Sequence, residues 1–324
     1  MLPGNLMTAF QVLIHGPVMP LVVNGISKML PVHKLWEQAD QDAFIATNGA
    51  KIQGLVGGFK AKIDGAFMDR LPNLKIIANF GVGYDMVDAV AAAERGIIVT
   101  NTPDVLNEEV ADTAFGLLLM TVKKLPQSER YLRAGKWETE GAYPLTASLR
   151  GRTMGIVGLG RIGKAIARRA EAFGLKLAYF GRKKQDDIAY PYYSDLVAMA
   201  RDVDILMLIL PGGASTYRLV GREVLEALGP DGILINVARG TVVDEPVLVE
   251  MLEKRAILGA GLDVFEHEPK LTKGLSDLDN AVLLPHVGSA TQFTRNEMGQ
   301  LVVDNVLAIA AGKPPLTPVA ETPW

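Results

Sequence analysis

Short apolar runs rich in valine, isoleucine and leucine recur along the chain and alternate with helix-type patterns. Strands that are apolar along their whole length are typical of parallel sheets covered by helices on both faces. In the first third of the chain these runs cover residues 10–15, 32–36, 52–58, 74–80 and 97–100. In the middle they cover residues 153–160, 175–181, 204–210, 232–238, 257–265 and 281–286. Each set is sufficient for one doubly wound parallel sheet, which predicts an α/β protein with two such domains.

Two helical patterns predict how the domains divide the chain. Residues 108–125 read as one long helix with Asn107 as its N-cap, which can carry the chain from the first domain into the second. Residues 295–312 form a last helix that ends at Gly312 and is expected to return to the first domain. The first domain is then 1–106 plus 291–324, and the second is 107–290. Residues 135–150 lack periodicity and are predicted to form a loop.

Composition excludes several classes of protein. The 324 residues contain 33 Lys and Arg against 36 Asp and Glu, so no basic field for nucleic acid is expected. There is no cysteine, which removes disulfides, thiolate nucleophiles and Cys-based zinc sites and leaves redox chemistry to a bound cofactor. The apolar stretch 10–23 contains two prolines and is shorter than the roughly 20 residues that span a bilayer. We therefore expect no metal and no membrane, and a cytoplasmic location.

A glycine motif follows the first apolar run of the second domain. It consists of Gly158, Leu159, Gly160, Arg161, Ile162 and Gly163 and is followed by an amphipathic helical pattern. Strand, glycine-rich turn and helix together favour a dinucleotide site, because the turn lets a pyrophosphate approach the N–H groups of the helix end. A purely structural turn is the alternative.

The next strand pattern ends in basic residues. An NAD site usually has an acidic residue there for the ribose hydroxyls, whereas this chain has Arg182 and Lys183 after Gly181. Two cations favour the 2′-phosphate of NADPH, with NADH still possible. The alternative is a solvated turn, and the nearby Asp186 and Asp187 would weaken the field.

Closer to the C-terminus, the chain contains an arginine, a histidine and a glutamate that are suited to the reduction of a 2-keto acid. Arg239 can pair with a carboxylate and polarise a keto oxygen, and His286 can give the developing alkoxide a proton. A carboxylate beside the histidine would favour its imidazolium form. From the residues alone, either Glu266 or Glu268 could supply it, and each of the three roles could instead belong to a structural residue.

Five motifs follow one another along the chain: the glycine motif, Leu210-Pro211, and the segments 236–240, 261–269 and 284–291. In these motifs and in their order the chain resembles the D-isomer-specific 2-hydroxyacid dehydrogenase family, and the resemblance covers nearly its whole length. The resemblance implies a flavodoxin-like substrate domain and a Rossmann dinucleotide-binding domain joined by a hinge. It also selects Glu268, the glutamate before Pro269, as the partner of His286.

The resemblance implies further contacts. For the cofactor these are Leu210, Pro211, Val237, Ala238, Asp263 and Thr113. For the substrate they are Val56, Gly57, Val82, Gly83 and Trp137, together with Arg239 and His286. Asp263 could instead be a strand-end cap, Thr113 a buried helix residue, and Trp137 a hydrophobic anchor of a homodimer.

The expected activity is NADPH-preferring reduction of a small 2-keto acid, glyoxylate or hydroxypyruvate, to the D-2-hydroxy acid by a homodimer. Formate and phosphite dehydrogenases share the fold, but Glu268 and the lack of a long N-terminal extension resemble the keto-acid branch. An aromatic 2-keto acid reductase, acting on phenylpyruvate or hydroxyphenylpyruvate, is an alternative within the family. An NAD(H)-sensing interaction protein of the corepressor type is an alternative from another class.

Overall fold

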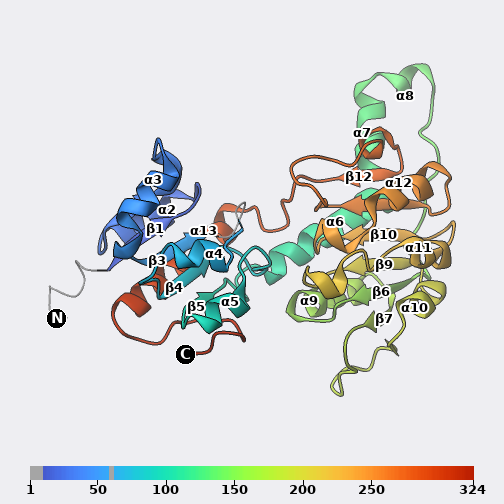
Figure 1. The fold of residues 1–324 in the computed structure, drawn as a ribbon. Helices are drawn as coiled ribbons and strands as arrows, with labels where there is room; N and C mark the ends of the chain where they lie inside the picture. The colour runs from blue at the N-terminus through green and yellow to red at the C-terminus, as the bar shows by residue number, and fades with distance from the viewer. Residues whose placement is uncertain (1–9, 58–61) are drawn as a thin grey trace. The chain divides into compact units, whose positions relative to one another are not determined.

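The computed structural model describes residues 10–57 and 62–324. The chain divides into two compact units, one made of the described part of Met1–Leu106 with Thr291–Trp324, and the other of Asn107–Ala290. Each unit contains one sheet in which neighbouring strands run parallel (Figure 1). The predicted α/β fold with two parallel sheets is confirmed.

The sheet of unit 1 has the strand order β2-β1-β3-β4-β5. Its strands are β1 (Gln11–Ile14), β2 (Val32–Lys34), β3 (Ile52–Gly57), β4 (Ile76–Asn79) and β5 (Ile98–Thr100). The chain turns back at the edge after β2 and then builds outward on the other side of β1. The strand order therefore reverses between β1 and β3, and in sheets of this order ligands bind beyond the carboxyl ends of those strands.

Helices surround this sheet. They are α2 (Pro20–Ser27), α3 (Gln41–Asn48), α4 (Gly65–Asp69), α5 (Ala89–Glu94) and α13 (Gln292–Ala310), with the 3₁₀ turns η1 (Leu35–Glu37) and η2 (Gly49–Lys51). The last helix, α13, packs against α2 and β4, so the end of the chain does return to the first unit. The tail beyond it lies along β5, where the Thr322 hydroxyl accepts the Val99 N–H at 2.9 Å.

The sheet of unit 2 has the strand order β12-β11-β10-β9-β6-β7-β8. Its strands are β6 (Thr153–Val157), β7 (Lys176–Phe180), β8 (Tyr192–Tyr193), β9 (Ile205–Leu208), β10 (Ile233–Asn236), β11 (Gly259–Leu262) and β12 (Ala281–Leu283). Only β8 has no counterpart among the predicted strands, because a two-residue edge strand leaves no apolar run in the sequence.

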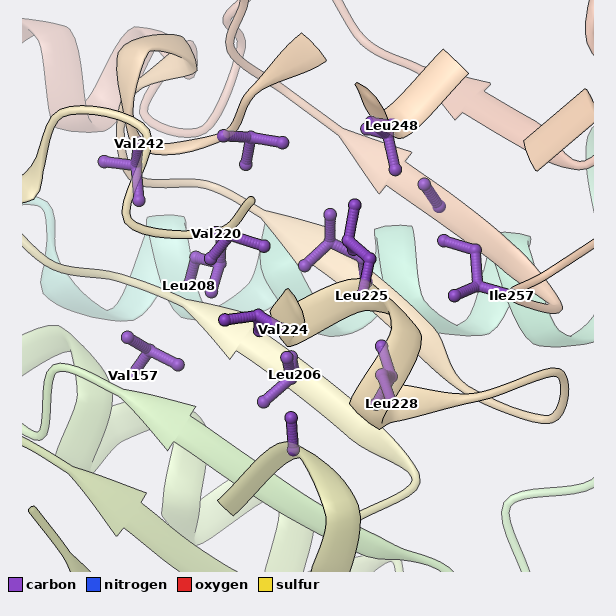
Figure 2. Packing of buried hydrophobic residues seen from close by; sticks show 14 of the residues in the cluster. Val157, Leu206, Leu208, Val220, Val224, Leu225, Leu228, Val242, Leu248 and Ile257 are labelled. Atoms are coloured by element: carbon purple, nitrogen blue, oxygen red, sulfur yellow. The ribbon is translucent and has the colours of Figure 1, made fainter. Parts of the chain in front are cut away.

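Every residue of the central strands β9 and β10 is buried, as expected for strands covered on both faces. Leu206 and Leu208 of β9 pack with side chains of α11 (Arg222–Leu228) and α12 (Glu245–Glu253), as Figure 2 shows. This core holds the carboxyl ends of the strands rigidly, and the loops that follow those ends carry the candidate site residues.

The remaining helices of unit 2 are α6 (Asn107–Lys123), α7 (Leu125–Arg133), α8 (Lys136–Thr139), α9 (Arg161–Ala172) and α10 (Leu196–Asp202), with the 3₁₀ turns η3 (Ala214–Thr216), η4 (Gly240–Val242) and η5 (Leu275–Asp277). Asn107 is the first residue of α6 rather than its cap. The helix stops at Lys123 because Lys124 has the left-handed φ of 48°, so the predicted end at residue 125 was wrong.

The prediction of a loop over residues 135–150 was also wrong in part. Gly135, with φ of 70°, starts the one-turn helix α8, which contains Trp137. In the described structure neither α7 nor α8 has a buried residue, so the inward apolar stripe that marks a helix in a sequence is missing there. Both helices extend away from the sheet of unit 2 in Figure 1.

No helix in the described part of the chain is long and apolar enough to cross a membrane.

Candidate active site

The glycine turn connects β6 to the N-terminus of α9. Gly158 has φ of 103°, a conformation that favours glycine. A Cβ on Gly163 would lie 2.4 Å from the Gly158 carbonyl oxygen, so α9 can approach the turn this closely only because residue 163 is glycine. In the described structure no atom lies within 4 Å of a Cβ built on Gly160, the N-cap of α9. Gly160 directly precedes the N–H groups that every helix leaves unpaired in its first turn, an arrangement that fits a pyrophosphate.

A basic loop follows β7 and contacts the glycine turn. The Gln185 side chain in this loop donates a hydrogen bond to the Leu159 carbonyl at 2.8 Å. Arg182 and Lys183 are exposed, and neither has an acidic partner within 4 Å among the residues the structure describes. Asp187, in contrast, is paired with Lys164 at 3.2 Å, and this contact lowers the pKa of Asp187. Asp187, one of the two aspartates that could weaken the basic field, is therefore partly offset by Lys164.

Arg239 follows β10 in a tightly held turn. The Asn236 side chain accepts the Ala238 N–H at 3.0 Å and donates to the Arg239 carbonyl at 3.0 Å, while Arg239 Nη1 donates to the Ala238 carbonyl at 2.8 Å. A Cβ on Gly240 would lie 1.8 Å from the carbonyl carbon of Phe265. Only glycine at 240 lets the turn that carries Arg239 rest on the backbone that leads to Glu268.

His286 and Glu268 are in direct contact. His286 Nδ1 lies 2.8 Å from Glu268 Oε2, and Glu268 Oε1 accepts the Phe265 N–H at 3.1 Å. Partial burial opposes ionisation of Glu268, but the His286 ring, the Phe265 N–H and the charge of Arg239 together lower its pKa below the usual value. The carboxylate is therefore ionised near neutral pH and holds the imidazole by one nitrogen.

The glutamate in contact with His286 is thus Glu268, the one that the resemblance selects. Glu266 points elsewhere, to the Tyr217 hydroxyl at 3.2 Å and to Arg218 at 3.4 Å.

Asp263 and Glu245 hold the loops that carry this pair. The buried carboxylate of Asp263 accepts the N–H groups of Val287 and Gly288, each at 2.8 Å, just after His286, whose φ of 55° is rare for a residue other than glycine. Glu245, only 2% exposed, accepts the Glu266 N–H at 2.7 Å and the Thr272 hydroxyl at 2.5 Å, one on each side of Glu268.

The predicted substrate residues of unit 1 follow adjacent strands. Val56 and Gly57 are buried at the end of β3. Val82 and Gly83 follow β4, and their carbonyls accept the side-chain amides of Asn101 at 2.8 Å and Asn79 at 3.1 Å. Their N–H groups have no acceptor within the described ranges 10–57 and 62–324. Two such donors side by side are suited to a carboxylate.

The other predicted contacts also lie at the carboxyl edge of the sheet in unit 2. Leu210 and Pro211 follow β9, and Leu210 packs against the glycine turn, because a Cβ on Gly158 would lie 3.0 Å from Leu210 Cβ. Val237 and Ala238 are buried after β10. Thr113 lies on α6 and donates a 3.3 Å hydrogen bond to the Gly288 carbonyl. Trp137 stands apart, on the exposed face of α8.

Strand order explains how residues far apart in the sequence meet in unit 2. Arg239 follows β10, Glu268 follows β11 and His286 follows β12, three neighbouring parallel strands, and the glycine turn follows β6 at the same edge. A fixed cation, a carboxylate-held imidazole and an anion cradle therefore share one edge of one sheet. In the described residues no group of three or more histidine or acidic side chains is arranged to hold a metal ion.

Several residues that shape the site were not singled out from the sequence. They are Asn236, Gly240 and Glu245 in unit 2, and Asn79 in unit 1. Glu245 could have been noticed as a charged residue in a helix start that is otherwise apolar, but nothing local indicates that its partners lie at residues 266 and 272. The clearance at Gly240 likewise depends on a loop 25 residues away.

Known proteins resemble this chain closely. The family described as "D-isomer specific 2-hydroxyacid dehydrogenase, NAD binding domain" matches residues 115–288. Hydroxyphenylpyruvate reductase of Plectranthus scutellarioides is 44% identical over 97% of this chain and 100% of the relative. Glyoxylate/hydroxypyruvate reductase A of Arabidopsis thaliana is also 44% identical, with the same coverage.

Among solved structures, the NADPH-dependent glyoxylate/hydroxypyruvate reductase of Sinorhizobium meliloti, in complex with NADP and malonate, matches with a TM-score of 0.93. It is 51% identical, and the match covers 98% of each chain. The expected family is therefore confirmed, and with it a nicotinamide-dependent enzyme that acts on 2-keto or 2-hydroxy acids. The chain belongs to the D-isomer specific 2-hydroxyacid dehydrogenase family.

Proposed function

We propose that this protein reduces glyoxylate or hydroxypyruvate to the D-2-hydroxy acid and prefers NADPH to NADH. The observation that carries the proposal is the 2.8 Å contact between His286 and Glu268, with the charge of Arg239 close enough to lower the pKa of that carboxyl. These are a proton donor, its orienting anion and a carboxylate-binding cation, delivered by three neighbouring strands.

Arg239 binds the substrate. Its planar guanidinium can form two hydrogen bonds to a carboxylate or share them between the carboxylate and the keto oxygen, which lysine cannot do. Because the turn at 236–240 is fixed by Asn236 and by the close approach of Gly240, the cation is held in place before substrate arrives. It therefore stabilises charge on the keto oxygen at little cost in reorganisation.

His286 supplies the proton. With Nδ1 held by Glu268, Nε2 is the atom left to face the substrate, and it donates to the oxygen that becomes the alkoxide. In the reverse direction the same nitrogen accepts the proton of the 2-hydroxy acid. The ionised Glu268 binds Nδ1 and fixes the plane of the ring.

The glycine turn, Leu210, Pro211, Val237 and Ala238 would hold the nicotinamide dinucleotide, and Arg182 with Lys183 would bind its 2′-phosphate. NADPH, when bound, supplies the hydride that the keto carbon receives. Asp263 keeps lone pairs for the nicotinamide amide, although both its oxygens already accept backbone N–H groups. Thr113 on α6, which donates to the Gly288 carbonyl, would also contact the cofactor.

In unit 1 the N–H groups of Val82 and Gly83, beside Val56 and Gly57, would bind the substrate carboxylate.

The direct test is the initial rate of NADPH or NADH oxidation with glyoxylate, hydroxypyruvate and phenylpyruvate. Fast turnover of the two small acids with NADPH, and a lower KM for NADPH than for NADH, is the expected result. Cofactor binding without turnover of any of the three acids would contradict the proposal and favour a nucleotide-sensing role.

An aromatic substrate is the second candidate. The observation that favours it is the hydroxyphenylpyruvate reductase that is 44% identical over the whole of its length. In the same assay, a kcat/KM for phenylpyruvate above that for hydroxypyruvate would replace the small-acid proposal with this one.

We also propose that the enzyme is a homodimer joined through α7, α8 and the segment after them. Leu132 is 56% exposed, Trp137 65% and Leu145 102%, although all three are large and apolar. A second copy of this surface would cover them. Trp137 either anchors that interface or reaches the partner's substrate pocket.

A further inference from the structure

We propose that His15 is a specificity-determining residue that recognises the substituent on C3 of the 2-keto acid, above all the hydroxyl group of hydroxypyruvate. The inference rests on the proposed function and adds to it a residue that the motifs of the chain do not point to. It is argued from unit 1 alone.

The first argument is topological. His15 is the residue that follows β1, and its N–H donates to the Val56 carbonyl at 2.9 Å. It therefore lies beside the end of β3, at the point where the strand order β2-β1-β3-β4-β5 reverses. Sheets of this order bind ligands in the crevice outside the carboxyl ends of these two strands.

The second argument is the order of the candidate groups along this edge. The strands β1, β3 and β4 are neighbours (Figure 1). In the sequence, His15 follows β1, Val56 and Gly57 end β3, and Val82 and Gly83 lie in the loop after β4. The ends of β1 and β4 are two strand spacings apart, roughly 9.6 Å. In hydroxypyruvate the distance from a carboxylate oxygen to the C3 hydroxyl oxygen is roughly 4.5 Å. With one hydrogen bond of about 3 Å at each end, the molecule would bridge two protein groups roughly 10.5 Å apart, which is close to two strand spacings. With its carboxylate on the N–H groups of Val82 and Gly83, the acid would extend its C3 end toward His15.

The third argument is the state of the His15 ring. It is half-buried and packs against Phe67, with the ring centroids 5.2 Å apart and the planes at 57°. Neither ring nitrogen has a hydrogen-bond partner among the described residues, in contrast to His33 in the same sheet, whose Nε2 lies 2.8 Å from Gln11 Oε1. Burial lowers the pKa of His15, so the ring is neutral near pH 7 and can accept a hydrogen bond as well as donate one.

A neutral imidazole against an aromatic ring suits a hydroxymethyl group. The hydroxyl can hydrogen-bond to a ring nitrogen, and the methylene can pack on Phe67. A methyl group in the same place would leave the nitrogen without a partner, which is how sites built around a hydroxyl discriminate against analogues that lack it.

The test compares three substrates in the wild-type enzyme and in His15→Phe, which keeps an aromatic ring against Phe67 and removes both nitrogens. Hydroxypyruvate differs from pyruvate only by the C3 hydroxyl, and glyoxylate has no C3. We expect kcat/KM for hydroxypyruvate to fall roughly five- to tenfold, the loss typical of one hydrogen bond, while pyruvate and glyoxylate stay within about twofold. His15→Gln, which restores a donor and an acceptor, should recover part of the preference for hydroxypyruvate over pyruvate.

The matched control is His33→Phe, which removes a half-buried histidine of the same sheet that also packs on a phenylalanine, Phe44. Its ratio of hydroxypyruvate to pyruvate turnover should equal that of the wild type. If His15→Phe does not fold, His15→Leu serves for the same comparison.

An unchanged ratio in the His15 variants, or an equal loss for all three acids, would overturn the assignment of His15 and leave the reductase proposal intact. A wild-type enzyme that reduces none of the three acids would overturn both.

Discussion

At the scale of single residues, the proposed chemistry would depend on side chains that hydrogen bonds already hold in place. Glu268 is held by the Phe265 N–H and holds His286 in turn, and Arg239 is held by the turn that Asn236 braces. The proposed dinucleotide edge is different, because Arg182 and Lys183 are exposed and would act mainly through charge.

His286→Asn is expected to lower kcat by roughly 10²- to 10⁴-fold, the usual contribution of a positioned acid or base. Asparagine is preferred to alanine because it tolerates the positive φ of 55° at this position. The Kd of NADPH, measured by fluorescence titration, should stay within about twofold of the wild type. His267→Asn, at an exposed histidine next to Glu268 in the loop after β11, is the control, and substantial turnover by His286→Asn would refute the role of His286 as the acid.

Replacing Arg182 and Lys183 together by glutamine should raise the KM for NADPH roughly 10- to 100-fold and change the KM for NADH by less than about twofold, because only NADPH has the 2′-phosphate. In the wild-type enzyme, high salt should raise the KM for NADPH more than the KM for NADH, because salt screens the exposed charges that would bind the 2′-phosphate. Lys184→Gln, at the adjacent exposed lysine, is the control. Equal changes for the two cofactors would contradict the phosphate assignment.

At the scale of elements, the site depends on how closely turns, helices and loops approach one another. The glycine turn touches α9 at Gly163, the turn at Gly240 touches the loop before Glu268, and the loop 266–272 is held to α12 by Glu245. Contacts of this kind affect stability and positioning together.

Two alanine variants of the glycine turn should separate stability from binding. Gly163→Ala places a Cβ 2.4 Å from a carbonyl oxygen and should lower the free energy of unfolding by roughly 1–3 kcal/mol, as overpacking does. Gly160→Ala meets no described atom within 4 Å, so the fold should tolerate it while the methyl group obstructs the pyrophosphate. Denaturant unfolding and NADPH titration measure the two effects. A Gly160→Ala enzyme that binds NADPH normally would exclude this turn as the cradle.

Glu245→Ala leaves the Glu266 N–H and the Thr272 hydroxyl without their acceptor in a buried place, which should cost about 2–4 kcal/mol of stability. Because those two groups flank Glu268, kcat should fall more than the affinity for NADPH. Glu245→Gln keeps one acceptor oxygen and should recover part of both losses. Denaturant unfolding measures the stability, and kcat and the Kd of NADPH are measured on the same variants. A stable Glu245→Ala enzyme with normal kcat would show that the loop 266–272 keeps its position without Glu245.

At the scale of the whole molecule, each unit places its candidate groups along the carboxyl edge of its own parallel sheet. Unit 1 offers N–H donors and His15, and unit 2 offers the cradle, Arg239 and the His286–Glu268 pair. The helices α7 and α8 serve neither edge, and their exposed apolar side chains are the reason to expect a second subunit.

Trp137→Ala is predicted to weaken a dimer by roughly 10- to 100-fold in Kd, because a tryptophan at the centre of an interface often contributes a large share of the binding energy. Sedimentation velocity over a range of concentrations measures this. Trp324→Ala, at a tryptophan that is 63% exposed against 65% for Trp137, is the control. Altered substrate selectivity with an unchanged dimer would favour contact with the partner's pocket, and a monomeric wild type would refute the interface.

The sequence by itself predicted the class of fold and the glycine turn, and it singled out Arg239 and His286 as candidate site residues. Apolar runs, a strand–glycine–helix pattern and ordered motifs are local features, and local spacing encodes them directly. The same locality explains the failures at α7 and α8, because helices with no buried face leave no apolar stripe to detect.

The residues alone left Glu266 and Glu268 open as partners of His286, and only the family resemblance selected Glu268; the tertiary structure shows Glu268 in contact with His286 and Glu266 in contact with Tyr217. It also decided the roles of Gly240 and Glu245, and it put His15 beside Val56. Each of these contacts joins segments that are distant along the chain and meet only through strand order and packing. No local pattern records which strands become neighbours, so the side chains that meet at their ends became known only with the fold.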